Sequence, residues 1–183
     1  MSAYVKRLAD YDIERLTEAV DAMFTASAFY GRIKPHMTVI LKPNLVMRSA
    51  PEEAIITHPN VTAAVAICLL RQGADVLVAE SGGGPYNTSI MKGTFRACGY
   101  TEAAEKYSFS LYTACKSTAV QLPEGKRCNT LTVTELFERP RETLVIDIAK
   151  LKTHGMMGYS GAVKNLFGVV PGLLKPVSYT HLT

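Results

Sequence analysis

The sequence predicts an α/β domain with a mostly parallel sheet flanked by helices. Three apolar runs, at residues 37–41, 75–79 and 143–148, do not alternate with polar residues, which is typical of strands buried on both faces of a parallel sheet. Segments with helical spacing lie between these runs. A chain of 183 residues that is 48% hydrophobic and 20% charged can form one such domain with a sizeable core.

Composition argues against several classes of partner. The net charge of +4 comes from scattered basic residues, so we expect no nucleic acid partner. No apolar run approaches the ~18 residues of a membrane span, and residues 1–12 lack the apolar core of a signal peptide, so we expect no membrane. The cysteines at 68, 98, 115 and 128 match no cluster or zinc spacing, which predicts no cofactor or metal in this chain and free thiols in a cytoplasmic setting.

The N-terminal third predicts a helix and then a strand. Apolar residues recur at helical spacing from Asp12 onward, with acidic residues in the first turn and Gly31 beyond the end, so an amphipathic covering helix begins there. The strand at 37–41 runs into Lys42-Pro43-Asn44. Because Pro43 has no N–H to donate, we expect the strand to end there and to leave Lys42 and Asn44 near the end of the sheet.

A second helix is predicted to start at Thr57-His58-Pro59. Thr57 suits the N-cap, Pro59 is tolerated in the first turn, and Gly73 ends the helix. His58 then lies in the first turn. A local hydrogen bond is the commoner role for such a histidine, and catalysis or metal ligation is the rarer one.

The strand at 75–79 leads into Glu80-Ser81-Gly82-Gly83-Gly84, and one helix is expected from about Thr88 to Tyr107. Three glycines allow a ligand to approach the backbone, but they are not the GxGxxG fingerprint. The layering is therefore Rossmann-like without a dinucleotide fingerprint, and we assign no nicotinamide cofactor. Further strands are predicted at 109–115, 118–122 and 131–133, with a turn at 123–129.

The most informative stretch is 143–172. If the extended conformation lasts to His154, Lys150, Lys152 and His154 share one side of the strand. Glycines 155, 158 and 161 follow, and then a short helix with Ser160 as its N-cap. Glycines and a helix N-terminus are the parts of an anion cradle. A tight turn with solvated lysines is the alternative, and this stretch alone favours neither.

Three loops follow the carboxyl ends of predicted strands, which is where an open α/β sheet has its ligand crevice. We therefore expect their side chains to share one site. His154 and Lys152 are the candidate catalytic residues. The candidate ligand-binding residues are Lys42, Asn44, His58, Glu80, Ser81, Gly82, Gly83, Lys150, Gly158, Ser160, Gly161, Lys164 and Asn165.

Four motifs together resemble the family catalogued as domain of unknown function 362. They are ILKPNLV at 40–46, THP at 57–59, ESGGG at 80–84 and IAKLKTHGMMGYSGAVKNLFGVVPG at 148–172. Members of that family are often fused to ferredoxin-like iron-sulfur modules. The resemblance thus implies the ligand-binding part of an iron-sulfur-associated redox enzyme acting on a small anionic substrate, with the cluster in a missing C-terminal part or a ferredoxin-like partner.

The sequence also departs from the family pattern. It holds no Cys-rich module, and it stops soon after Lys175-Pro176, where relatives usually continue. We therefore expect residues 1–176 to form a single, incomplete α/β domain and residues 177–183 to be a non-native tail.

Whether the chain is an enzyme stays open at this stage. In an enzyme, the lysines would bind a carboxylate or phosphate, the glycine loop would donate N–H groups, and His154 or His58 would transfer a proton or bind a metal. A non-catalytic anion-binding module, or a scaffold whose polar loops only keep it in solution, are the alternatives.

Overall fold

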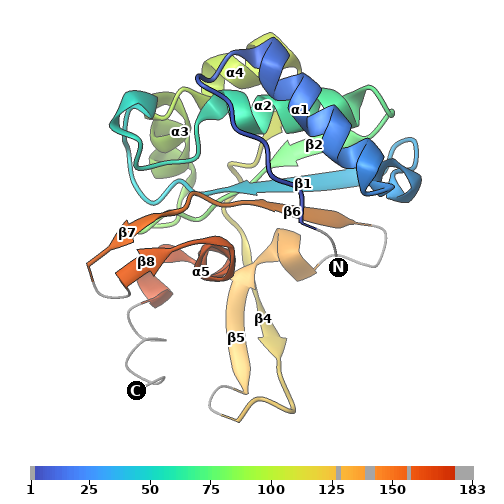
Figure 1. Cartoon of the computed structure of the whole chain (residues 1–183). Coiled ribbons are helices and arrows are strands. Elements are labelled where there is room, and N and C mark those ends of the chain that lie inside the picture. Colours follow the sequence, from blue (N-terminus) through green and yellow to red (C-terminus); the bar gives the residue numbers. More distant parts are fainter. Residues whose placement is uncertain (1–2, 127–128, 139–142, 156–157, 176–183) are drawn as a thin grey trace.

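A four-stranded parallel sheet forms the centre of the computed structural model, which describes residues 3–126, 129–138, 143–155 and 158–175. Its strand order is β3-β2-β1-β6 (Figure 1). The strands are β1 (Thr38–Pro43), β2 (Asp75–Val78), β3 (Ser110–Leu111) and β6 (Leu144–Ile148). Val39 of β1 pairs with Val76 on one side and Leu144 on the other. The predicted neighbouring parallel strands, and the α/β class, are confirmed.

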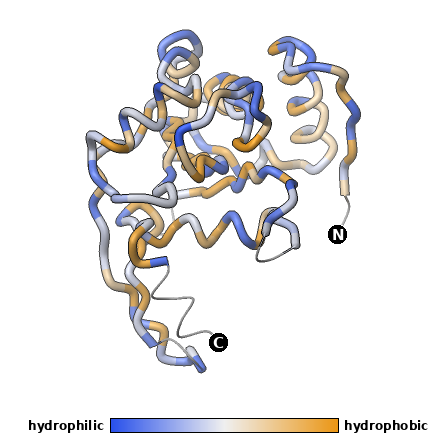
Figure 2. The backbone as a smooth tube through the Cα atoms, turned by 90° about the vertical axis from the view of Figure 1, so that its left-hand side faces the viewer, coloured by the Kyte–Doolittle hydropathy of each residue, from blue (hydrophilic) through white to orange (hydrophobic). Residues whose placement is uncertain are grey.

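Helices cover one face of this sheet, as Figure 1 shows for α1 (Ile13–Ala26), α2 (Pro59–Leu70) and α4 (Tyr100–Tyr107). Successive strand residues face opposite sides. Val39 and Leu41 therefore join the core under the helices, while Ile40 packs on the other face. The side chains of Val39, Ile40 and Leu41 are fully buried, in keeping with a strand that is covered on both faces. Figure 2 shows hydrophobic stretches of the backbone in the middle of the molecule.

The start of α1 is as predicted, but the start of α2 is not. Asp12 is the N-cap of α1 and its carboxylate accepts the Arg15 N–H. The prediction of Thr57 as the N-cap of α2 is wrong: His58 is the N-cap, and its Nδ1 accepts the Asn60 N–H at 3.2 Å. Thr57 instead donates its hydroxyl to the carbonyl of Ile148 at 2.7 Å, which ties the loop to the end of β6.

The single helix predicted over 88–107 is in fact two, α3 (Thr88–Ala97) and α4. Gly99 separates them with a φ of +74°, a left-handed conformation that ends helices. The predicted strand at 109–115 is only β3, and Cys115 has a φ of +55°, which is incompatible with a continuing strand. The predicted turn at 123–129 lies partly outside the described residues.

A two-stranded antiparallel ribbon, β4 (Ser117–Gln121) with β5 (Thr130–Thr134), extends away from the central sheet (Figure 1). Short 3-10 turns complete the described part of the chain: η1 (Phe29–Arg32), η2 (Pro51–Glu53), η3 (Glu135–Glu138), η4 (Phe167–Val169) and η5 (Gly172–Leu174).

Two expectations for the C-terminal stretch are wrong. The strand does not last to His154: β6 ends at Ile148, and β7 (Lys152–His154) pairs with β8 (Gly158–Ser160) in a separate antiparallel hairpin. Ser160 is not a helix N-cap, because pairing with Lys152 keeps it extended as the last residue of β8. Gly161 occupies the N-cap position of α5 (Ala162–Leu166).

After α5 the chain crosses close to the loop that follows β2. A Cβ added to Gly172 would lie 2.2 Å from the Gly84 carbonyl oxygen and 3.0 Å from the Gly83 carbonyl carbon. Backbone therefore meets backbone at this crossing, and only glycine allows it. The predicted tail at 177–183 lies outside the described residues.

We expect Gly172→Ala to lower the free energy of unfolding by about 1–3 kcal/mol, as overpacking against an immovable neighbour does. Gly31→Ala is the matched control, because a Cβ there meets nothing within 4 Å. Urea unfolding of the two variants beside the parent chain measures the difference. Overlapping curves for all three proteins would contradict the close crossing.

Candidate functional site

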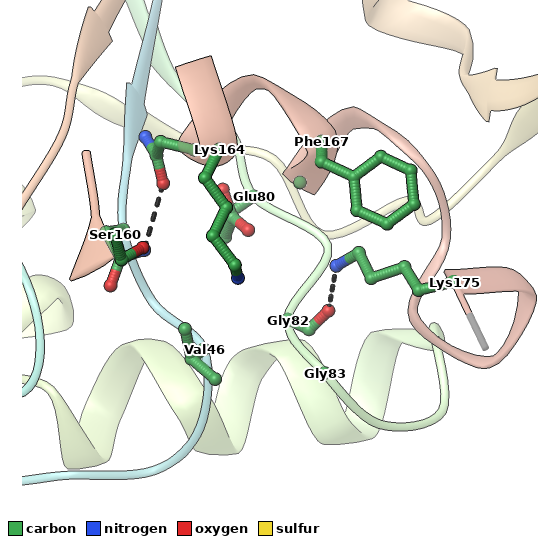
Figure 3. A pocket seen from close by; sticks show the side chains of 11 residues that line it. Val46, Glu80, Gly82, Gly83, Ser160, Lys164, Phe167 and Lys175 are labelled. Carbon is green, nitrogen blue, oxygen red and sulfur yellow. Dashed lines mark hydrogen bonds between the residues drawn. The ribbon is translucent and has the colours of Figure 1, made fainter. Parts of the chain in front are cut away.

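A pocket of about 90 Å³, here called the polar pocket, opens where β1 and β2 end (Figure 3). Four segments form it: the residues after β1, the loop after β2, the end of β8, and the stretch from α5 to Lys175. Its lining residues are Asn44, Val46, Glu80, Gly82, Gly83, Ser160, Lys164, Asn165, Phe167, Gly168 and Lys175. The site thus occupies the expected crevice at the carboxyl ends of parallel strands.

A buried ion pair forms the floor of the polar pocket. The Lys42 ammonium donates to the Glu80 carboxylate, and their side chains are 0% and 5% exposed. Gly168 covers the pair: a Cβ on it would lie 2.4 Å from Lys42 Nζ and 2.6 Å from Glu80 Oε1. Since this carboxylate is paired, Glu80 does not leave an uncompensated negative charge in the pocket.

A chain of hydrogen bonds runs along one wall of the pocket. Asn165 Nδ2 donates to Asp147 Oδ1, and Asn44 Nδ2 donates to Asn165 Oδ1 at 3.0 Å. Lys152 then donates to Asn44 Oδ1 at 2.7 Å and also to the Ile55 carbonyl. This network fixes both asparagines, which come from segments 121 residues apart in the sequence.

Asp147 and Lys152, at the two ends of this series of hydrogen bonds, have shifted pKa values. Burial raises the pKa of Asp147, although Asn165 and Lys42 act against that rise. Its Oδ2 is buried with no hydrogen-bond partner within the described ranges. Burial lowers the pKa of Lys152, and the neighbouring charges of Lys164 and Lys150 lower it further.

Two ammonium groups enter the polar pocket from the C-terminal stretch, as Figure 3 shows for Lys164 and Lys175. Lys175 donates to the Gly82 carbonyl and to Ser81 Oγ at 3.2 Å. Its burial, together with the charges of Lys42 and Lys164, lowers its pKa to about 8, although Glu80 acts in the opposite direction. Lys164 has no hydrogen-bond or ion-pair acceptor among the described residues.

The structure gathers about half of the predicted site residues into one place. Those that line the pocket are Asn44, Glu80, Gly82, Gly83, Ser160, Lys164 and Asn165. Lys42, Ser81 and Lys152 lie directly behind this lining, since they contact Glu80, Lys175 and Asn44 respectively. The glycine loop, residues 82–84, is not an open cradle of donors, because the Gly83 N–H donates to the Val46 carbonyl at 2.8 Å.

The other predicted residues are not among the lining residues: His58, Lys150, His154, Gly158 and Gly161. His58 stacks on Tyr11 with ring centroids 3.9 Å apart, and Lys150 donates to the Tyr11 hydroxyl at 3.3 Å. Burial lowers the pKa of His58, an effect that Glu52 opposes and Lys150 reinforces. The structure therefore brings neither candidate histidine to the polar pocket.

Sequence reasoning missed Lys175, Phe167, Gly168 and Val46, which all line the pocket. Lys175 and Gly168 belong to a stretch of 3-10 turns with no period that would orient a side chain. The Ser81 hydroxyl lies within hydrogen-bond distance of the Gly168 and Val170 carbonyls, at 2.6 and 2.7 Å. These long-range contacts draw the stretch over the pocket, and no local signal predicts them.

The described residues do not offer the ligand set of an iron-sulfur cluster. No group of three or more His, Cys, Asp or Glu side chains within the described ranges could hold a metal ion. Cys68 and Cys98 are buried, and burial raises the pKa of both thiols. Such thiols are poor metal ligands.

Comparisons with known proteins support the family resemblance that the four motifs predicted. The family model described as Domain of unknown function (DUF362) matches residues 39–181. Thylakoid-associated protein sll1697 of Synechocystis sp. is 33% identical over 149 residues, which make up 78% of this chain and 42% of that protein. The chain thus spans less than half of that relative's length. No solved structure matches the present chain.

In the part of the chain that the structure describes, no helix combines the length and the apolar character that crossing a bilayer requires. The relative's name associates that protein with thylakoids. The cytoplasmic location of the present chain therefore stays a prediction.

Removal of one partner of the buried ion pair should be costly. We expect Lys42→Met to lower the free energy of unfolding by about 3–5 kcal/mol, because it leaves the buried Glu80 carboxylate without its partner. In the double variant Lys42→Met/Glu80→Gln the loss should be smaller than the sum of the two single losses.

Arg15→Met serves as the control, because the Arg15–Asp10 pair is exposed and such pairs contribute only about 0–1 kcal/mol. Urea unfolding of all four variants measures the coupling. Strict additivity of Lys42→Met and Glu80→Gln would show that the two groups do not depend on each other.

Proposed function

We propose that this chain, which belongs to the DUF362 family as its motifs predicted, binds a small carboxylate or phosphate in the polar pocket. One observation carries the proposal: two ammonium groups, Lys164 and Lys175, enter a pocket whose carboxylate, Glu80, is already paired with Lys42. The pocket therefore has a surplus of positive charge that an anion would balance.

The energetics favour an anion over solvent alone. Burial is the main cause of the lowered pKa of Lys175, and repulsion from the charges of Lys42 and Lys164 lowers it further. An anion between Lys164 and Lys175 removes their repulsion and gains charge-assisted hydrogen bonds worth ~1.5–3 kcal/mol each. A volume of about 90 Å³ accommodates a few atoms, which suits the charged group of a small ligand better than a whole nucleotide.

The bound anion has two possible roles: the substrate of a redox enzyme, or the ligand of a non-catalytic binding module. Family resemblance supports the substrate-binding part of an iron-sulfur-associated redox enzyme. Because the described residues hold no ligand set for a cluster, the electron carrier would belong to a ferredoxin-like partner or a further segment. The placement of His58 and His154 away from the pocket lining favours a non-catalytic anion-binding module instead.

These two readings differ in one measurable outcome. A redox enzyme would reduce a bound carboxylate with electrons from reduced ferredoxin, or oxidise it by passing electrons to oxidised ferredoxin. A binding module would release the carboxylate unchanged. Mass spectrometry of the carboxylate before and after incubation distinguishes them, with Lys175→Met as the control for turnover at this pocket.

Lys164→Met and Lys175→Met should each weaken the binding of sulfate by about tenfold or more, since each removes a charge-assisted contact of ~1.5–3 kcal/mol. Lys150→Met is the matched control: Lys150 contacts Tyr11 and is not among the lining residues. Calorimetric titration with sulfate and acetate measures all three. Equal affinity for the parent and both pocket variants would overturn the proposed site.

Binding should also depend on pH. Lys175 has a pKa of about 8 without ligand, and a bound anion raises it because the anion stabilises the charged form. Sulfate affinity should thus be constant well below pH 8 and should fall above it, by up to tenfold per pH unit. Sulfate is chosen because it stays a dianion throughout. The Lys175→Met protein should lack this decline, and a parallel decline in both proteins would assign it to another group.

A further inference from the structure

A second, larger pocket adjoins the polar pocket. It has a volume of about 470 Å³ and lies between the glycine loop and α3. Most of its lining side chains are apolar: Val46, Met47, Pro85, Ile90 and Met91. Arg48 and Thr94 also line it, and the Arg48 guanidinium lies against Gly93 of α3. We call it the apolar pocket. Binding a small anion in the polar pocket does not need this second cavity, so the cavity calls for a separate explanation.

The two pockets meet along a shared boundary. Val46, Gly82 and Gly83 line both of them. Figure 3 shows Val46 and the two glycines next to the Lys164 and Lys175 ammonium groups. The Gly83 N–H donates to the Val46 carbonyl at 2.8 Å, which fixes this boundary. The two pockets are therefore adjacent, and a ligand bound to the lysines would reach the apolar pocket by passing over Val46.

Two apolar side chains of the apolar pocket are exposed. Val46 is 41% and Met47 is 56% exposed, although both stand beside a cavity that could bury them. A ligand lying across them would remove this apolar surface from water, which favours binding. Charge complementarity at one end and apolar surface at the other together define a single amphipathic ligand.

We infer that the ligand is an anion with an apolar body of several carbon atoms, such as a medium-chain or aryl carboxylate. This inference rests on the proposed function. The charged group contacts Lys164 and Lys175 in the polar pocket. The apolar body crosses Val46 and occupies the apolar pocket against Ile90 and Met47. This assigns a substrate class, amphipathic carboxylic acids, to a site whose lysines alone would accept any small anion.

The test is a titration of the full chain with acetate, butyrate, hexanoate and octanoate, with octanol as a neutral probe. Affinity should rise by roughly fourfold for each buried methylene, the equivalent of ~0.8 kcal/mol. Acetate is too short to reach the apolar pocket and serves as the internal reference. Octanol should bind much more weakly than octanoate, because it lacks the charge that the lysines recognise.

Three variants locate the chain-length effect. Ile90→Phe should fill part of the apolar pocket, and Met47→Ser should remove apolar surface from its edge; both should flatten the rise from acetate to octanoate. Leu122→Ser is the matched control, because Leu122 follows β4 outside both pockets and is 37% exposed. It should leave the rise unchanged. Thermal melts confirm that each variant is folded.

The outcomes separate this inference from the proposed function. Acetate binding that depends on Lys175 but does not strengthen with chain length would leave the anion site standing and overturn the amphipathic ligand. No binding of any carboxylate or of sulfate would overturn both. Octanoate binding that Lys164→Met and Lys175→Met leave unchanged would show an apolar site unconnected with the lysines, which also overturns the inference.

Discussion

The burial of Lys42 against Glu80 is the constraint on which the rest of the site depends. Lys42 belongs to an inner strand of a parallel sheet and its side chain is fully buried. Such a charge is tolerated only when a partner of opposite charge neutralises it. Glu80 supplies that partner from the end of β2. Gly168 must then lack a side chain, because a Cβ there would collide with both the Lys42 ammonium and the Glu80 carboxylate. One ion pair thus links β1, β2 and the C-terminal stretch.

The C-terminal stretch is held over the sheet mainly by polar contacts. Asn165 contacts Asp147, Asn44 and the Lys42 carbonyl, while Ser81 and Lys175 bond to backbone carbonyls across the crossing. Such networks are stabilising when every member is satisfied. The free oxygen of Asp147, unpaired within the described part of the chain, marks the place where this network is incomplete.

The proposed binding properties follow from the same arrangement. Because Lys42 already neutralises Glu80, the charges of Lys164 and Lys175 remain available to an anion. Because the glycine loop approaches both Val46 and Gly172 closely, its backbone separates a cationic pocket from an apolar one. The same packing that buries the Lys42–Glu80 ion pair therefore also shapes the proposed ligand site.

The sequence by itself determined the parallel sheet, the start of α1 and the region of the site. Apolar strands and the end of each strand are local features, so Asn44, Glu80 and Lys164 could be predicted to lie together. Only the tertiary structure decided the break at Gly99, the separate β7–β8 hairpin and the position of Lys175. These depend on close backbone crossings and on contacts between residues far apart in the chain, which no local periodicity encodes.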